Sequence, residues 1–151
     1  MYSRILVPVD GSPPSLAGLK EAITLATDGG ATIVVLNVAS ELPLATAPEG
    51  FVAYREFVDA LSAAGRAIVK EAGKEVEKAG VKVESLVLDV GMSPVSDAIV
   101  EQIGRQRCDL VVMGTHGRRG LKRLTLGSDA ELVVRQSPVP VLLVKAPPAA
   151  K

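Results

Sequence analysis

The segment from Gly114 to Ser128 combines residue types that suit the binding of an anion. It contains four glycines and four basic residues but no acidic residue. Glycine lets the backbone approach a ligand closely and adopt positive φ angles, and bare N–H groups beside positive charge hold phosphates. The segment ends where a helix is predicted to begin, and a helix N-terminus favours an anion. The basic residues of this predicted phosphate-binding loop are Arg118, Arg119, Lys122 and Arg123.

A structural explanation of the same segment stays open. Glycine-rich surface loops often only turn the chain, and residues 128–131 have the S-x-x-E pattern of a capping box, which explains Ser128 without a ligand. The segment also matches neither G-x-x-x-x-G-K-[ST] nor G-x-G-x-x-G, the two common phosphate-binding motifs. The residues alone therefore leave both alternatives open.

Short β-branched runs alternate with helical patterns and would position this segment. Three of the runs are nearly continuous in apolar character, which is typical of strands buried on both faces of a parallel sheet. The alternation predicts an α/β fold, a doubly wound, Rossmann-like parallel sheet with helices on both faces. One domain is expected over residues 1–146, with a flexible tail at 147–151. The predicted strands are residues 5–9, 33–38, 81–90, 110–113 and 139–144.

Serines and glycines mark where the predicted helices begin and end. Ser12, Ser93 and Ser128 are predicted N-caps, the first two followed directly by proline. Gly29-Gly30 is expected to end the first helix, in which Leu16, Leu19, Ile23 and Ala26 recur at helical spacing. The second helix is predicted over about 52–79, weakened internally by Gly65 and Gly73.

Ligands of such sheets bind beyond the carboxyl ends of the strands, where the winding reverses. This rule points to the residues that follow each predicted strand. They are Asp10-Gly11-Ser12, Val38-Ala39-Ser40, Gly91-Met92-Ser93 and Gly114-Thr115-His116-Gly117.

The spacing of Gly114, Gly117, Gly127 and Ser128 resembles the ATP-binding pattern of the universal stress protein family, G-x-x-G, nine residues, then G-[ST]. The runs at 4–12, 109–114 and 137–144 are also similar to segments of that family, so the resemblance covers nearly the whole chain. It implies a five-stranded parallel sheet in the order 3-2-1-4-5, with the first and fourth strands side by side. Since every fixed position of the pattern is kept, the resemblance is to the ATP-binding members.

The resemblance implies roles for individual residues. Asp10 would meet the ribose hydroxyls, which a carboxylate can accept, although in Asp-Gly-Ser it could instead only shape the turn. The backbone around Val9 and Val38 would hold adenine. His116, the single histidine, is either a solvated side chain or a phosphate contact. The implied nucleotide-binding residues are Pro8, Val9, Asp10, Val38, Met113, Gly114, His116, Gly117, Arg118, Gly127, Ser128 and Asp129.

Asp129 departs from the family pattern, in which an apolar residue usually follows the serine. A carboxylate in the first helical turn pairs well with the helix dipole of an empty site, but it would repel a phosphate. The bound cofactor is therefore expected to be ATP together with Mg²⁺ or Mn²⁺, with weaker binding when the cation is absent. No metal site made by protein ligands alone is expected.

No general base or attacking group is evident for a reaction. A Ser-His-Asp set from Ser12, His116 and Asp10 is disfavoured, because there is no G-x-S-x-G elbow and Ser12 precedes a proline as a cap. Cys108 and His116 lie at opposite ends of one predicted strand, too far apart for a catalytic pair. The expected function is a nucleotide-dependent regulatory or stress-response protein with little or no turnover. A dimeric scaffold without functional nucleotide and a slow ATPase or autophosphorylating protein stay open.

Composition excludes other classes of function. Among 151 residues, 17 basic residues balance 17 acidic ones, which excludes the broad basic field of a general nucleic-acid binder. Two Tyr, two Phe and no Trp provide no base-stacking platform, and a single cysteine excludes a disulfide framework. No apolar stretch is long enough to cross a membrane and no signal-peptide pattern is present. A cytoplasmic location is expected.

The last predicted strand, Val139 to Val144, is apolar, with Pro138 directly before it and Pro140 near its start. An exposed edge of this kind promotes aggregation unless it is paired or covered. Universal stress proteins often dimerise through this strand, so the resemblance implies a homodimer. The alternative is that helices and the tail cover the strand within one chain.

Overall fold

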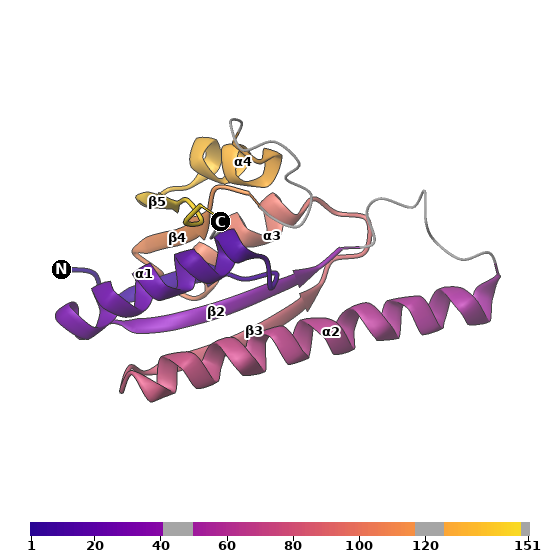
Figure 1. Cartoon of the computed structure of the whole chain (residues 1–151). Helices are drawn as coiled ribbons and strands as arrows, with labels where there is room; N and C mark the ends of the chain where they lie inside the picture. The colour runs from indigo at the N-terminus through magenta and orange to yellow at the C-terminus, as the bar shows by residue number, and fades with distance from the viewer. Residues whose placement is uncertain (41–49, 117–125, 149–151) are drawn as a thin grey trace.

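Five parallel strands alternate with four helices in the part of the chain that the computed structural model describes, residues 1–40, 50–116 and 126–148 (Figure 1). The predicted α/β fold and element order are confirmed. The elements are β1 Arg4–Pro8, α1 Pro13–Gly29, β2 Thr32–Ala39, α2 Phe51–Lys78, β3 Val83–Asp89, α3 Val95–Arg105, β4 Leu110–Gly114, α4 Ser128–Gln136 and β5 Val141–Val144.

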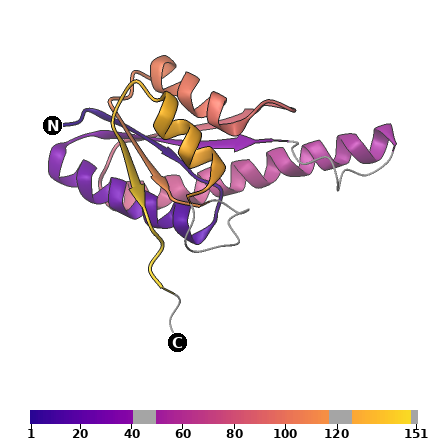
Figure 2. The same ribbon diagram turned by 90° about the horizontal axis from the view of Figure 1, so that it is seen from above.

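The strands form one sheet in the order β3-β2-β1-β4-β5, which confirms the implied order. β1 pairs with β2 on one side and with β4 on the other. The winding therefore reverses between β1 and β4, and their carboxyl ends lie side by side at one edge. The helices α1 and α2 cover one face of the sheet, and α3 and α4 cover the other (Figures 1 and 2).

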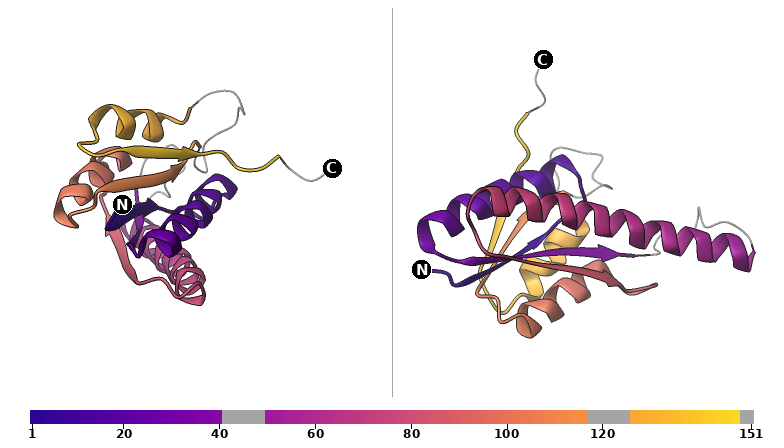
Figure 3. Two further views of the ribbon diagram at one scale, coloured as in Figure 1. Left: turned by 90° about the vertical axis from the view of Figure 1, so that its left-hand side faces the viewer. Right: turned by 90° about the horizontal axis from the view of Figure 1, so that it is seen from below.

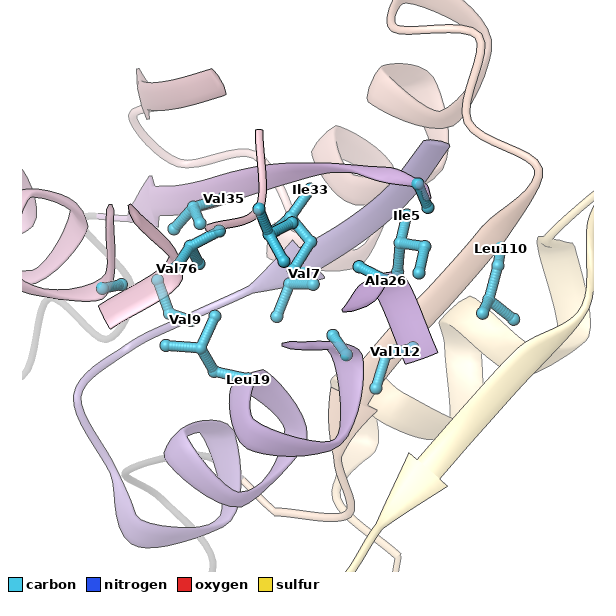
Figure 4. Close-up of a cluster of buried hydrophobic side chains, with 14 of the residues drawn as sticks. Ile5, Val7, Val9, Leu19, Ala26, Ile33, Val35, Val76, Leu110 and Val112 are labelled. Atoms are coloured by element: carbon cyan, nitrogen blue, oxygen red, sulfur yellow. The ribbon is translucent and has the colours of Figure 1, made fainter. Parts of the chain in front are cut away.

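Two apolar clusters hold these layers together. On one face, Ile5 and Val7 of β1 pack with Ile33 and Val35 of β2 against α1 and α2, as Figure 4 shows. Leu6 between them points to the opposite face, where it packs against α3 and α4. Because side chains alternate along a strand, two clusters in one sheet require strands that are apolar at every position, as the sequence predicted.

One of the three predicted N-caps is confirmed. The Ser12 Oγ accepts a hydrogen bond from the Ser15 N–H, with proline at the first helical position, and Gly30 ends α1 at a φ of 72°. Pro94 and Gly127 are the N-cap residues of α3 and α4 instead. The capping-box explanation of Ser128 was wrong, because the Gly127 carbonyl already accepts the Glu131 N–H and the helix begins at Ser128.

The long helix α2 runs past the end of the sheet at its N-terminal half (Figures 1 and 3). Over the sheet, Gly65 is buried against Asn37, and a Cβ at that position would overlap the Asn37 side-chain oxygen. A glycine within a helix lowers its stability relative to alanine, but here only glycine leaves room for the Asn37 side chain. In α1, Leu19 and Ala26 are buried, whereas Leu16 is 42% exposed.

Candidate functional site

The turn from β1 into α1 is fixed by its own polar side chains. The Asp10 carboxylate accepts a hydrogen bond from the Ser12 N–H at 2.9 Å, so Asp10 shapes this turn, and its contact with a ribose stays a prediction. The Ser15 hydroxyl lies 3.3 Å from the Asp10 N–H and donates to the Ser12 carbonyl at 3.0 Å. Asp10 is therefore held in place at the carboxyl end of β1, half-buried at the edge of the sheet.

Val9 is less available to a ligand than its position in the sequence predicts. Its N–H donates to the Leu36 carbonyl and its carbonyl accepts the Asn37 side-chain amide, each at 2.8 Å. Val9 is also 3% exposed and belongs to the core beneath α1. The residue therefore anchors the end of β1 to β2.

Val38 is better placed to present backbone groups to a ligand. In a parallel strand, the N–H and C=O of one residue point to the same side, and successive residues alternate. The Leu36 carbonyl bonds Val9 on the β1 side, and the Ala39 carbonyl bonds Val90 on the β3 side. Val38 shares the parity of Leu36, so its backbone groups point toward β1, at the level where the chain leaves the sheet after β1.

Gly114 is required by packing at the end of β4. A Cβ at this position would lie 2.5 Å from the Pro14 carbonyl carbon and 2.7 Å from its oxygen. Gly18, one turn further along α1, also lies close to the β4 backbone, where a Cβ would be 3.2 Å from the Met113 carbonyl carbon. The first turn of α1 thus rests directly on the end of β4, which brings the end of β4 next to the Asp10 turn.

The end of β4 is also joined to the start of α4. The Gly127 N–H donates to the Thr115 carbonyl at 2.8 Å, and a Cβ on Gly127 would lie 3.2 Å from the same oxygen. The α-helix that follows leaves the N–H groups of its first turn without carbonyl partners inside the helix. These groups and the Ser128 hydroxyl therefore lie at the same edge of the sheet as Asp10.

The structure places the other predicted residues as follows. Pro8 is half-buried at the end of β1, and Met113 is buried one residue before the end of β4. His116 is half-buried, and its Nδ1 lies 3.0 Å from the Thr115 hydroxyl. Asp129 lies in the first turn of α4. Gly117 and Arg118, with the other three basic residues of the loop, lie outside the described residues.

Two residues, Asn37 and Thr115, position this site, although the sequence assigned neither of them a role. Asn37, buried in the middle of an apolar run, holds the Val9 carbonyl. Thr115 is buried, accepts the Gly127 N–H, and donates its own N–H to the Val144 carbonyl of β5 at 3.0 Å. The available signal was a single polar residue within or directly after an otherwise apolar strand, since buried polar groups need partners.

The described residues contain no group of three or more His, Cys, Asp or Glu side chains that could hold a metal ion. They also contain no helix long and apolar enough to cross a membrane. Burial raises the pKa of the single cysteine, Cys108, to about 11. This thiol lies at the amino end of β4, away from the site, and is a poor nucleophile at neutral pH.

These features define a doubly wound α/β protein with a candidate ligand site at the switch point between β1 and β4. A family model described as the universal stress protein family matches residues 1–145, and the chain belongs to this family. It is 36% identical over 148 residues to universal stress protein MJ0531 of Methanocaldococcus jannaschii, covering 97% of this chain and 84% of that protein.

Two solved structures show the same architecture. The structure of MJ0577 from the same archaeon superposes with a TM-score of 0.83 at 29% identity and covers 99% of both chains. A universal stress protein solved in complex with cAMP has a TM-score of 0.68 at 25% identity, covering 97% of this chain and 98% of its own.

Proposed function

We propose that this chain binds an adenine nucleotide, ATP in the first instance, at the carboxyl ends of β1, β2 and β4. The observation that carries the proposal is the convergence at one sheet edge of the Asp10 turn, the backbone groups of Val38 and the N-terminus of α4. The family membership and the cAMP complex of a relative support an adenine ligand. The nucleotide would act as a regulatory signal, with little or no turnover.

The adenosine end would lie toward β2. The N–H and C=O of Val38 match the acceptor and donor on the edge of adenine, and the Asp10 carboxylate suits the ribose hydroxyls. Pro8, Met113 and His116 would border the nucleoside. Val9 would support this end only from beneath, because both of its backbone groups already have partners.

The phosphates would lie toward α4, beside Gly114, Gly127 and Ser128, with Gly117 and Arg118 contributing from the loop. The N-terminus of α4 favours their negative charge, but Asp129 and Glu131 in its first turn oppose it. A divalent cation between Asp129 and the phosphates would offset this repulsion. We therefore expect ATP to bind together with Mg²⁺ or Mn²⁺.

A homodimer through the last strand is part of the proposal. β5 is the edge strand next to β4, and Leu142 within it is 37% exposed. Exposed Leu132 and Val134 on α4 add apolar surface. Sedimentation that shows only monomer at micromolar concentration would contradict the dimer. Residues 1–146 would act as one cytoplasmic domain, followed by the tail.

Released nucleotide gives the first test. The purified protein is denatured, and the supernatant is separated by chromatography to detect an adenine nucleotide. Protein stripped of nucleotide is then titrated with ATP by calorimetry, with Mg²⁺ and with EDTA. We expect saturable binding that weakens in EDTA. No released nucleotide together with no binding would refute the proposal and favour a scaffold role, and multiple turnovers to ADP would instead indicate an ATPase.

Glycine variants locate the site. Gly127→Ala, alone or together with Gly117→Ala, should abolish ATP binding, because a methyl group would obstruct the approach of the phosphates to the backbone. The φ of −62° at Gly127 is compatible with alanine, and the added Cβ would require only a small shift of the Thr115 carbonyl oxygen, 3.2 Å away, so the fold should persist. Gly104→Ala is the matched control, since nothing lies within 4 Å of its added Cβ. Unchanged affinity in Gly127→Ala would contradict the assignment of the phosphate end.

A further inference from the structure

A largely apolar groove is lined by residues of α1 and α2. These two helices lie on the face of the sheet opposite α3 and α4 (Figure 3). The volume of the groove is about 360 Å³. Leu19 and Ala72 are almost fully buried and belong to the core beneath it, and Ile68 packs against the same core. Leu16 lines the groove while 42% exposed. Leu16 thus contributes apolar surface at the groove.

The polar part of the groove is acidic. Ile68, Glu71, Ala72 and Glu75 recur along α2 at helical spacing and line one wall together. Among the described residues that line the groove, none is basic. The two carboxylates lie four residues apart, about 6 Å along the helix axis, so they place two acidic side chains, each paired with a lysine of the same helix, on one wall of an apolar groove.

Each carboxylate keeps binding capacity for a further cation. Lys74 contacts the Oε1 atom of Glu71 at 2.8 Å, and Lys78 contacts the Oε1 atom of Glu75 at 2.9 Å. The hydrogen bond from Lys74 lowers the pKa of Glu71, so this carboxylate is charged at neutral pH. All four side chains are at least half exposed, and exposed pairs of this kind exchange partners at little cost.

We propose that this groove docks a segment of a partner protein in which an aliphatic or aromatic side chain lies next to a lysine or arginine. The apolar side chain would fill the space over Leu19, Ile68 and Ala72 and cover Leu16. The neighbouring cation would lie on the wall formed by Glu71 and Glu75, where it complements their charge.

A protein segment fits this groove better than a small polar metabolite. Sites for such molecules place a few polar groups among apolar ones to fix the ligand's orientation. Here the ionisable side chains are confined to one wall, and the opposite wall carries an exposed leucine. An apolar centre with charged side chains at its margin is the usual arrangement of a protein interaction surface.

Three capped pentapeptides test the proposal: Gly-Phe-Lys-Lys-Gly, Gly-Phe-Glu-Glu-Gly and Gly-Ala-Lys-Lys-Gly, each acetylated and amidated. Each is titrated into the ¹⁵N-labelled chain without nucleotide, and amide chemical shifts are followed. The first peptide should shift the amides of Leu16, Leu19 and residues 67–75 and saturate. The other two should bind roughly fivefold more weakly or not at all, because each lacks either the cation or the apolar side chain.

Variants separate the groove from nonspecific attraction. The double variant Glu71→Gln/Glu75→Gln should weaken the first peptide by roughly fivefold. Glu77→Gln, an exposed change on the same helix outside the groove, should leave its affinity unchanged. Equal binding of all three peptides, or no effect of the double variant, would overturn the proposal. Concentration-dependent shifts of the same amides without peptide would overturn it in favour of a second copy of the chain.

Discussion

Gly114→Ala tests whether the end of β4 and the first turn of α1 are in direct backbone contact. The added Cβ would lie 2.5 Å from the Pro14 carbonyl carbon, whereas ordinary van der Waals contact begins at 3.4 Å. The two segments would therefore have to separate by 0.9 Å, the difference between these distances. Both are constrained, because Gly114 pairs with Val144 of β5 and Pro14 lies in the capped first turn of α1.

Overpacking of this kind costs about 1–3 kcal/mol, and we expect the upper half of that range because backbone must move. The smaller conformational entropy of unfolded alanine offsets about 0.4–1 kcal/mol of this cost. The expected net loss in the free energy of unfolding is about 2 kcal/mol. For a chain of this size, such a loss lowers the melting temperature by about 4–8 °C.

The assay is urea unfolding followed by circular dichroism without nucleotide, so that lost ligand binding cannot contribute. Gly104→Ala is the control, because it lies in α3 with nothing within 4 Å of its added Cβ. It should be neutral or raise the stability by up to about 1 kcal/mol. If Gly114→Ala unfolds within about 0.5 kcal/mol of wild type, the close contact between β4 and α1 is refuted.

Burial raises the pKa of Asp109, but the hydrogen bonds that its carboxylate accepts from the N–H groups of Arg4 and Ser3 outweigh this and lower it below the usual value. The Asp109 carboxylate therefore stabilises the fold above about pH 4, and this contribution is lost as the pH falls through the lowered pKa. In urea unfolding between pH 3 and 7, the difference in the free energy of unfolding between wild type and Asp109→Asn should become smaller in acid. A constant difference would contradict this. Burial raises the pKa of Cys108 from 9.0 to about 11, so the free energy of unfolding should fall as the pH rises from 9 to 11. Cys108→Ala should reduce that fall, and an equal fall in the variant would contradict the burial of the thiol. Arg4→Lys loses the bidentate ion pair with Glu84, in which each of two hydrogen bonds is 2.8 Å long. The variant should lower the free energy of unfolding by about 0.5–1 kcal/mol, because the pair is partly exposed. An unchanged urea midpoint would show that the pair does not stabilise the fold.

The fold could be predicted because its signals are local and repeated. Strands such as β1 and β4 are apolar at every position, and Ser12 and Gly30 mark the ends of α1 with the residue types that caps require. The strand order came from the family resemblance, since periodicity does not determine which strands pair. The errors at Ser93 and Ser128 arose because an S-P or S-x-x-E pattern does not determine where the chain first adopts helical angles.

The site was harder to predict, because its geometry depends on contacts between distant segments. Val9 and Val38 look equivalent in the sequence, but the Asn37 side chain occupies the Val9 carbonyl, and strand parity turns Val38 toward β1. Gly114 fits a phosphate motif, yet its contact with Pro14 already requires a glycine. Such packing demands become visible only when the two segments are placed together.

The central claim is that an adenine nucleotide binds where β1, β2 and β4 end, and amide chemical-shift mapping with ATP and Mg²⁺ tests it most directly. The account predicts saturable shifts concentrated at residues 10–12, 38–40, 113–116 and 126–130. The amides of the groove on α2, residues 67–75, should stay unchanged. No shifts at millimolar ATP, or shifts centred on the opposite edge of the sheet around Asp109, would contradict the account.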